Sequence, residues 1–183
     1  MSRESLYLQE EETTGLDSVH LAPLMSSTKL DWETPDKVLD LVRFTFCGPI
    51  RLDPCTTSAN PTQAQHIYTR ENSGLDAKWD SDFVYANPPY GRELPQWVDK
   101  IVTEYLRGCQ YMLVLVPART DTKWFRRLYD FSGALCLFSG RLKFRGAKAS
   151  APFPSAMFGL SVNYERFLTV FEDYGIVINP RNH

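Results

Sequence analysis

A four-residue segment, Asn87-Pro88-Pro89-Tyr90, combines a polar side chain, a rigid backbone and an aromatic ring. It directly follows Phe83–Ala86, an apolar stretch that predicts a buried strand. Two successive prolines restrict two φ angles and remove two backbone donors, and the first disfavours a helical conformation at Asn87. The motif therefore predicts a stiff loop at the carboxyl end of a strand, where open α/β sheets bind their ligands.

Such a loop would present the Asn87 side-chain carbonyl and neighbouring backbone carbonyls as fixed acceptors. An exocyclic amino group donates two N–H bonds, so two acceptors would bind it and aim its nitrogen lone pair at an electrophile. In-line transfer from a methyl sulfonium then needs mainly alignment and electrostatics, and no strong base. Tyr90 adds an aromatic face on which a flipped base would stack. The alternative interpretation is a rigid strand-to-helix turn without chemistry.

Basic residues are concentrated between positions 117 and 148, where only Asp121 and Asp130 oppose them. They are Arg119, Lys123, Arg126, Arg127, Arg141, Lys143, Arg145 and Lys148. This excess predicts a surface that faces phosphates, although the net charge of the chain is −2. Arg141, Lys143 and Arg145 alternate on a predicted hairpin, which would place them on one face. A solvated face, with Arg119 paired to Asp121, is the alternative.

The elements that would position these residues alternate between helix and strand, and then become strands with short connections. Thr34 is the expected N-cap of a helix that starts at Pro35 and ends before Gly48. Thr120 is the expected cap of a later helix. The predicted strands are 50–52, 66–69, 83–86, 111–116, 134–138, 142–144, 155–160 and 176–178, and the other predicted helices are 94–105, 121–130 and 164–171. This order predicts a three-layer α/β sheet with mixed, partly antiparallel edges.

Length and composition favour one compact domain, since the chain has 183 residues. Residues 1–28 are acidic and aperiodic, which predicts a flexible tail, and residues 29–183 form the expected catalytic domain, with no separate block for target recognition. No apolar run is long enough to span a membrane. Four scattered cysteines and three histidines do not suggest a metal site, and they favour a cytoplasmic protein with reduced thiols.

Several blocks of the sequence, read together, resemble the phage-type DNA N6-adenine methyltransferase family over about residues 30–162. The blocks are Trp32-Glu33-Thr34-Pro35, Leu52-Asp53-Pro54, Gly74-Leu75 with Trp79, Asn87-Pro88-Pro89-Tyr90-Gly91, the run 116–125, Phe138–Phe144 and Ala151–Ala156. The resemblance implies a Rossmann-like class I methyltransferase sheet and S-adenosylmethionine as the cofactor. It also implies catalysis at Asn87, Pro88, Pro89 and Tyr90.

On the cofactor side, the resemblance implies contacts from Thr34, Pro35, Asp53 and Pro54. Trp32 would either cover the cofactor or fill the core. Asp53 would accept hydrogen bonds from the cofactor's ammonium, although a turn residue before proline is its plain alternative. The sequence departs from larger methyltransferases because no glycine-rich loop follows Pro54. Only 34 positions separate Asp53 from Asn87, so the sheet must be reduced there, because one βαβ unit takes about 30 residues. Glu71 is the candidate acid for the ribose hydroxyls.

On the substrate side, the predicted DNA contacts are Arg119, Lys123, Arg126, Arg141, Lys143 and Arg145. The expected substrate is adenine N6 in double-stranded DNA, reached by base flipping, with short or relaxed sequence specificity. The alternatives are a protein-glutamine or RNA amino-methyltransferase, and an inactive nucleic-acid-binding relative. The resemblance also implies a phage or prophage protein acting in a bacterial cytoplasm. These features predict no oligomeric state.

Overall fold

The structure is a computed structural model that describes residues 32–181. The predicted tail, residues 1–28, lies outside the described residues. In chain order the elements are α1 (Asp36–Phe46), β1 (Leu52–Asp53), β2 (His66–Ile67), β3 (Val84–Ala86), α2 (Leu94–Leu106), β4 (Met112–Pro117), α3 (Lys123–Phe131), β5 (Ala134–Phe138), β6 (Ser155–Leu160), α4 (Tyr164–Phe171), a 3₁₀ helix (Glu172–Tyr174) and β7 (Gly175–Ile178).

The strands of the described region form one mixed sheet in the order β2-β1-β3-β4-β6-β5-β7. β2, β1, β3 and β4 are parallel neighbours. β6 lies antiparallel between β4 and β5, and β7 is antiparallel to β5 at the edge. The prediction of a mixed α/β sheet with antiparallel strands toward its end is confirmed.

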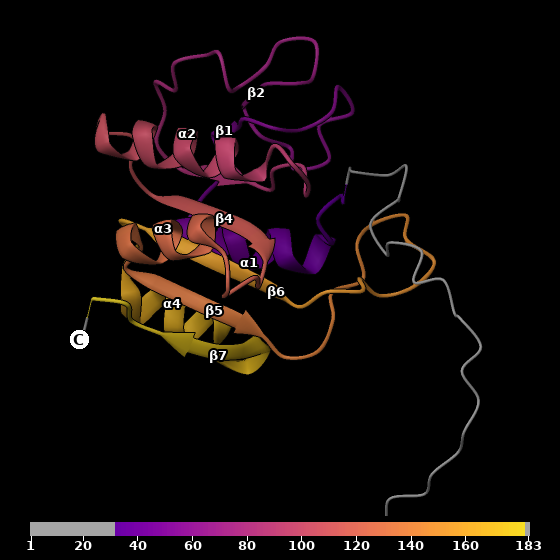
Figure 1. The fold of residues 1–183 in the computed structure, drawn as a ribbon, viewed down its shortest axis with the longest axis vertical. Helices are drawn as coiled ribbons and strands as arrows, with labels where there is room; N and C mark the ends of the chain where they lie inside the picture. The colour runs from indigo at the N-terminus through magenta and orange to yellow at the C-terminus, as the bar shows by residue number, and fades with distance from the viewer. Residues whose placement is uncertain (1–31, 182–183) are drawn as a thin grey trace, which may run out of the picture.

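Helices cover both faces of the sheet, and β4 shows why (Figure 1). Successive side chains of a strand point to opposite faces. Leu113 and Leu115 pack into the core that contains the apolar faces of α1 and α4. Val114 and Val116 pack into a second core with the apolar faces of α2 and α3. A strand buried on both sides is therefore a continuous apolar run, as the sequence shows.

The chain between β1 and β3 is short and contains no helix, and all of its residues are described. β2 has only two residues, His66 and Ile67. The rest of the segment consists of turns and loops. The predicted reduction between Asp53 and Asn87 is therefore seen directly.

Three local predictions are wrong. Pro35, and not Thr34, is the N-cap of α1, because the Thr34 hydroxyl bonds elsewhere. Thr122, and not Thr120, caps α3, where its side chain accepts from the Phe125 amide. Residues 142–144 form no strand, so the predicted hairpin does not exist. The chain from 139 to 154 is instead a long loop, called the basic loop below.

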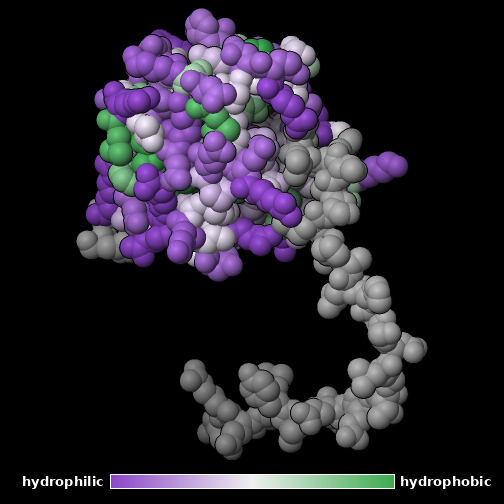
Figure 2. Space-filling view, turned by 45° about the horizontal axis from the view of Figure 1, so that its top comes forward, coloured by the Kyte–Doolittle hydropathy of each residue, from purple (hydrophilic) through white to green (hydrophobic). Residues whose placement is uncertain are grey.

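The visible surface is mainly hydrophilic, with small separate apolar patches (Figure 2). Large apolar side chains with clear exposure among the described residues are Phe44, Leu106, Tyr111 and Ile176. No helix in residues 32–181 is both long and apolar enough to cross a membrane. Within the same residues, no three metal-ligating side chains gather into a candidate site.

Candidate active site

Three parallel strands end at one edge of the sheet, and the candidate site lies there. β1 ends at Asp53, Asn87 follows β3, and β4 ends at Pro117. β5 runs parallel to β4, because both are antiparallel to β6. The basic loop that follows β5 therefore starts at the same edge, and it extends beyond the arrowheads of β4 and β5 (Figure 1). The topology thus brings the Asn-Pro-Pro-Tyr motif, Asp53 and this loop to one side.

The Asn87 side chain is held by its amide nitrogen. Nδ2 donates to the backbone oxygen of Trp32 at 2.5 Å and to Thr34 Oγ1 at 3.0 Å. Because a backbone carbonyl can only accept, these contacts assign the nitrogen to the Trp32 side of the amide. Asn87 Oδ1 is buried and has no hydrogen-bond partner in the structure. A buried carbonyl without a partner is uncommon, and it leaves one acceptor available in the predicted catalytic loop.

Tyr90 belongs to a cluster of aromatic side chains that packs on one side of the Asn-Pro-Pro-Tyr loop. Its ring is 8% exposed. Phe153 and Phe144 contact it edge-on, with ring centroids at 5.4 and 6.1 Å. Trp32 packs against the same two rings at 5.3 and 5.2 Å. The sequence predicts an open stacking face on Tyr90, whereas in this arrangement a base would have to displace one of the phenylalanines.

A cavity of about 550 Å³ lies beside the motif, within the size range of small-molecule sites. Of the predicted catalytic and cofactor residues, seven line it: Trp32, Thr34, Asp53, Pro54, Glu71, Asn87 and Pro89. Pro35, Pro88 and Tyr90 are not part of its lining. Residues far apart in sequence thus line one cavity.

Asp53 forms part of the cavity wall while being 3% exposed. Its Oδ1 accepts from the Cys55 amide at 3.1 Å, and its Oδ2 accepts from the Thr62 hydroxyl at 2.9 Å. Burial raises the pKa of the carboxyl from 3.8 to about 6, although these hydrogen bonds lower it. The ionised carboxylate is therefore under-compensated, and a cationic ligand in the cavity would stabilise it.

Glu71 lies at the exposed side of the same cavity. Its carboxylate accepts from the Thr69 hydroxyl at 2.7 Å, and this hydrogen bond lowers the pKa of Glu71. The neighbouring Ser73 and Leu75 line the cavity as well. The segment that replaces the missing crossover helix therefore forms a wall of the pocket.

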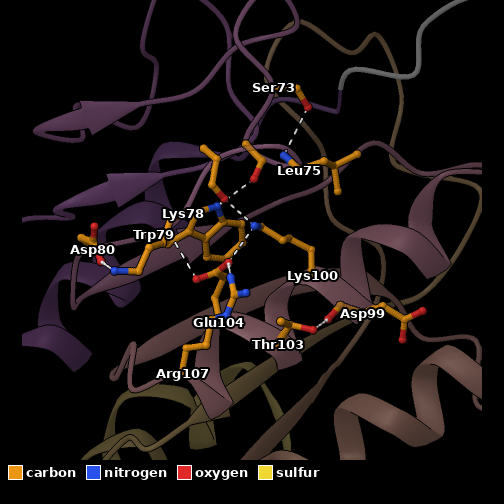
Figure 3. Close-up of polar contacts among 12 residues, drawn as sticks. Ser73, Leu75, Lys78, Trp79, Asp80, Asp99, Lys100, Thr103, Glu104 and Arg107 are labelled. Carbon is orange, nitrogen blue, oxygen red and sulfur yellow. Dashed lines mark hydrogen bonds and ion pairs between the residues drawn. The ribbon is translucent and has the colours of Figure 1, made fainter.

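This wall is packed tightly against the end of β1. A Cβ on Gly74 would lie 2.2 Å from the carbonyl oxygen of Pro54, so only glycine permits the approach. The Trp79 indole nitrogen donates to the Gly74 carbonyl at 2.8 Å. Ser73 Oγ accepts from the Leu75 amide at 3.2 Å, as Figure 3 shows.

A buried carboxylate on α2 anchors the same wall from below (Figure 3). Glu104 accepts from the Trp79 amide at 3.3 Å, from Lys100 Nζ at 2.7 Å and from Arg107 Nη1 at 3.1 Å. Lys100 Nζ also donates to the Ala77 carbonyl. Burial raises the pKa of Glu104, but the hydrogen bonds from Lys100 and Trp79 outweigh it, so the net pKa is lowered.

The six predicted DNA contacts are all exposed, but they are not equivalent. Arg126 pairs with Asp130 on its own helix at 2.7 Å. Arg145 pairs with Asp36 at the start of α1, and its amide donates to the Glu33 carbonyl at 2.8 Å. The basic loop is thus tied to the segment that contains Trp32 and Thr34. The remaining four, Arg119, Lys123, Arg141 and Lys143, lie on the β4–α3 connection, the start of α3 and the basic loop.

Four further residues at or beside the site are not among those predicted from the sequence: Cys55, Thr62, Tyr85 and Glu104. Cys55 and Thr62 line the cavity, and burial raises the Cys55 pKa well above its usual range. Tyr85 and Thr62 carry no local signal. Glu104 does carry one, because it lies seven positions after Trp97 and thus on the buried stripe of α2.

A mixed α/β sheet with an Asn-Pro-Pro-Tyr loop beside a cavity, at the carboxyl ends of its parallel strands, is consistent with a methyltransferase-like fold. A model of the family "DNA N-6-adenine-methyltransferase (Dam)" matches residues 23–161. The chain belongs to this family.

A curated relative supports the same assignment. This chain is 29% identical over 94 residues to the "DNA N-6-adenine-methyltransferase" of Haemophilus phage HP1 (strain HP1c1). The match covers 51% of this chain and 53% of the relative, so the chain spans about half the length of the curated relative that it matches.

Proposed function

We propose that this protein transfers a methyl group from S-adenosylmethionine to N6 of adenine in DNA. Residues 29–183 would form a single catalytic domain with a reduced, Rossmann-like class I methyltransferase sheet. Family membership and the phage relative support the reaction class. The single observation that carries the proposal is Asn87 Oδ1, a buried acceptor without a partner, next to a cavity of cofactor size.

The cavity lining fits the cofactor by its chemistry. S-adenosylmethionine, when bound, supplies a methyl group on a sulfonium as the electrophile. Asp53 is a buried acid whose raised pKa favours a cationic partner such as an α-ammonium. Glu71, at the exposed side, would accept from the ribose hydroxyls. Trp32 and Leu75 supply apolar surface for the remaining parts of the molecule.

Asn87 would bind the substrate nitrogen and not remove its proton. Oδ1 accepts one N–H of the adenine amino group, and a backbone carbonyl of the Pro88-Pro89 segment accepts the other. Two acceptors orient the nitrogen lone pair toward the methyl group. Because alignment and electrostatics account for most of such a transfer, no strong base is needed. The N–CH3 bond would form as the sulfur–methyl bond breaks to leave a neutral thioether, and the extra proton on nitrogen would then pass to water.

DNA would bind along the same edge. Arg119, Lys123, Arg141 and Lys143 would contact phosphates of double-stranded DNA, while Arg145 has a structural partner in Asp36. The target adenine would be flipped toward Asn87. Among residues 32–181 the basic loop and its surroundings are the segment placed to read bases, and we propose a short or relaxed recognition sequence. We also propose a cytoplasmic role in a phage-infected or lysogenic bacterium, which the phage source of the relative supports.

The direct test is methyl transfer from labelled S-adenosylmethionine to duplex DNA, followed by nucleoside analysis for N6-methyladenine. RNA and a glutamine-containing protein serve as alternative acceptors in parallel reactions. Asn87→Ala should lower kcat by about 100-fold or more, since a positioned hydrogen-bonding group is lost. Asn179→Ala, near the carboxyl terminus, is the matched control and should keep full activity. Transfer to RNA or protein in preference to DNA would replace this proposal with the corresponding alternative.

A further inference from the structure

An asparagine amide has two orientations of nearly the same shape, and only one of them suits the proposed reaction. Turning the Asn87 amide by about 180° would exchange Oδ1 and Nδ2. The turned amide would present N–H groups to an amino group that is itself a donor, and would place its oxygen against the Trp32 carbonyl. Catalysis therefore requires a feature that keeps Nδ2 on the Trp32 side.

Thr34 supplies one half of that feature. Asn87 Nδ2 has two N–H bonds, which go to the Trp32 backbone oxygen and to Thr34 Oγ1. Both amide hydrogens thus have acceptors in the observed orientation. The turned amide would place its oxygen against the Trp32 carbonyl, which can only accept, and it would need the Thr34 hydroxyl as a donor instead of an acceptor. The two acceptors lie 55 and 53 residues earlier in the chain, so only the folded protein places them there.

Tyr85 holds the Thr34 hydroxyl in turn. The two hydroxyl oxygens are 2.6 Å apart, and Thr34 and Tyr85 are 3% and 0% exposed. Burial raises the pKa of Tyr85 well above its usual range, so the phenol stays protonated and keeps this hydrogen bond. Tyr85 is on β3, two residues before Asn87, and Thr34 directly precedes Pro35, the N-cap of α1. A continuous chain of hydrogen bonds therefore runs from the core of the sheet to the Asn87 amide.

We infer that Thr34, supported by Tyr85, is a positioning residue that orients the Asn87 amide so that Oδ1 faces the substrate nitrogen. The inference rests on the proposed function, because it assigns Asn87 the role of acceptor. It gives Thr34 a task different from the one that its family resemblance implies. Thr34 acts through Asn87, and its contribution to cofactor affinity is small.

The test compares three variants by kcat at saturating cofactor, by Kd for S-adenosylmethionine and by thermal midpoint. Thr34→Val keeps the shape of the side chain but removes the acceptor, so kcat should fall about 10- to 50-fold while the cofactor Kd changes less than about threefold. Thr34→Ser restores the hydroxyl and should restore most of kcat. Tyr85→Phe frees the Thr34 hydroxyl and should lower kcat by about 3- to 10-fold.

Thr45→Val is the matched control for the loss of a buried threonine hydroxyl, here near the end of α1. Thr45 Oγ1 donates to the Leu41 carbonyl at 2.8 Å, away from Asn87. Its replacement should lower the thermal midpoint no less than Thr34→Val does, with kcat unchanged. If Thr34→Val does not fold, Thr34→Ala removes the same acceptor and takes its place.

The outcomes separate the inference from the function on which it rests. Loss of kcat in Thr34→Val with recovery in Thr34→Ser supports it. An unchanged kcat in Thr34→Val, or a loss confined to cofactor affinity, overturns it and leaves the proposed function standing. If the unaltered protein methylates no adenine in DNA, the proposed function fails and this inference fails with it.

Discussion

Binding of S-adenosylmethionine should release a proton from Asp53. Burial raises the pKa of this carboxyl to about 6 in the free protein. An α-ammonium in the cavity would favour the ionised form and lower that pKa again. The cofactor's own ammonium remains largely protonated up to about pH 7. Cofactor binding and ionisation of Asp53 are therefore linked.

The size of the effect follows from the pKa of about 6. At pH 6 about half of the molecules carry a neutral Asp53, so binding releases about half a proton per cofactor. At pH 7 the release falls to about one tenth of a proton. At pH 5 only about one tenth of the molecules are ionised, so the apparent Kd should be about tenfold weaker than at pH 7, or about 1.4 kcal/mol.

Calorimetric titration in two buffers with different ionisation enthalpies measures the proton release directly. Asp53→Asn should abolish it, because the amide can still accept from the Cys55 amide and the Thr62 hydroxyl can reverse its hydrogen bond. Methylthioadenosine, which lacks the amino-acid end of the cofactor, is the matched ligand control and should release no proton. Release by methylthioadenosine, or an equal release in Asp53→Asn, would show that Asp53 is not the ammonium's partner.

Stability gives a second readout of the same group. Since the folded pKa of Asp53 lies above its unfolded value of 3.8, its contribution is fully present below pH 3.8 and is lost as pH rises through about 6. Between pH 4 and 7 the unfolding free energy of the unaltered protein should decrease by about 2.4 kcal/mol relative to Asp53→Asn. Urea unfolding at both pH values measures this difference. Parallel pH profiles for the two proteins would refute a raised pKa at Asp53.

Four further substitutions test the wall of the cavity and the DNA surface. Gly74→Ala forces a Cβ onto the Pro54 carbonyl, so calorimetry should show cofactor binding weakened by about tenfold or more. Unchanged affinity would contradict the close packing of Gly74 against Pro54. Glu104→Ala removes the buried carboxylate that pairs with the Lys100 ammonium. The free energy of unfolding, measured in urea, should therefore fall by about 3–5 kcal/mol. Arg107→Ala removes an exposed partner of the same carboxylate, so it should lower the free energy of unfolding by less than about 1 kcal/mol. Equal losses in the two variants would refute the expectation that the buried carboxylate matters more than its exposed partner. Lys123→Ala should reduce the salt dependence of DNA binding by about 0.9 in the log–log slope, and an unchanged slope in fluorescence titrations would exclude a phosphate contact.

The secondary structure followed closely from patterns in the chain itself. β5, β6 and α4 have the predicted bounds, and α2 differs from its prediction by one residue. The apolar run before Pro117 predicted a strand buried on both faces, which β4 is. These elements could be predicted because apolar periodicity, capping residues and prolines act within a few residues of one another.

The hairpin at residues 142–144 shows where local patterns mislead. Alternating side chains are necessary for a strand, but a strand also needs a partner with free backbone groups. Here Leu142 accepts one backbone hydrogen bond, from the Ala151 amide. Phe144 instead packs between Trp32 and Tyr90, which lie far away in sequence. The aromatic contacts of the tertiary structure therefore decide the path of the basic loop.

The chain alone predicts that Asn87 ends a strand, that two prolines stiffen its loop and that Asp53 ends a neighbouring strand. Sheet topology then decides that Asn87 and Asp53 lie beside one cavity. The orientation of the Asn87 amide depends on Trp32 and Thr34, and the pKa of Asp53 depends on burial. Hydrogen bonds across more than 50 residues and the loss of solvent around a carboxyl group arise only when the chain is folded, because both depend on which distant atoms become neighbours.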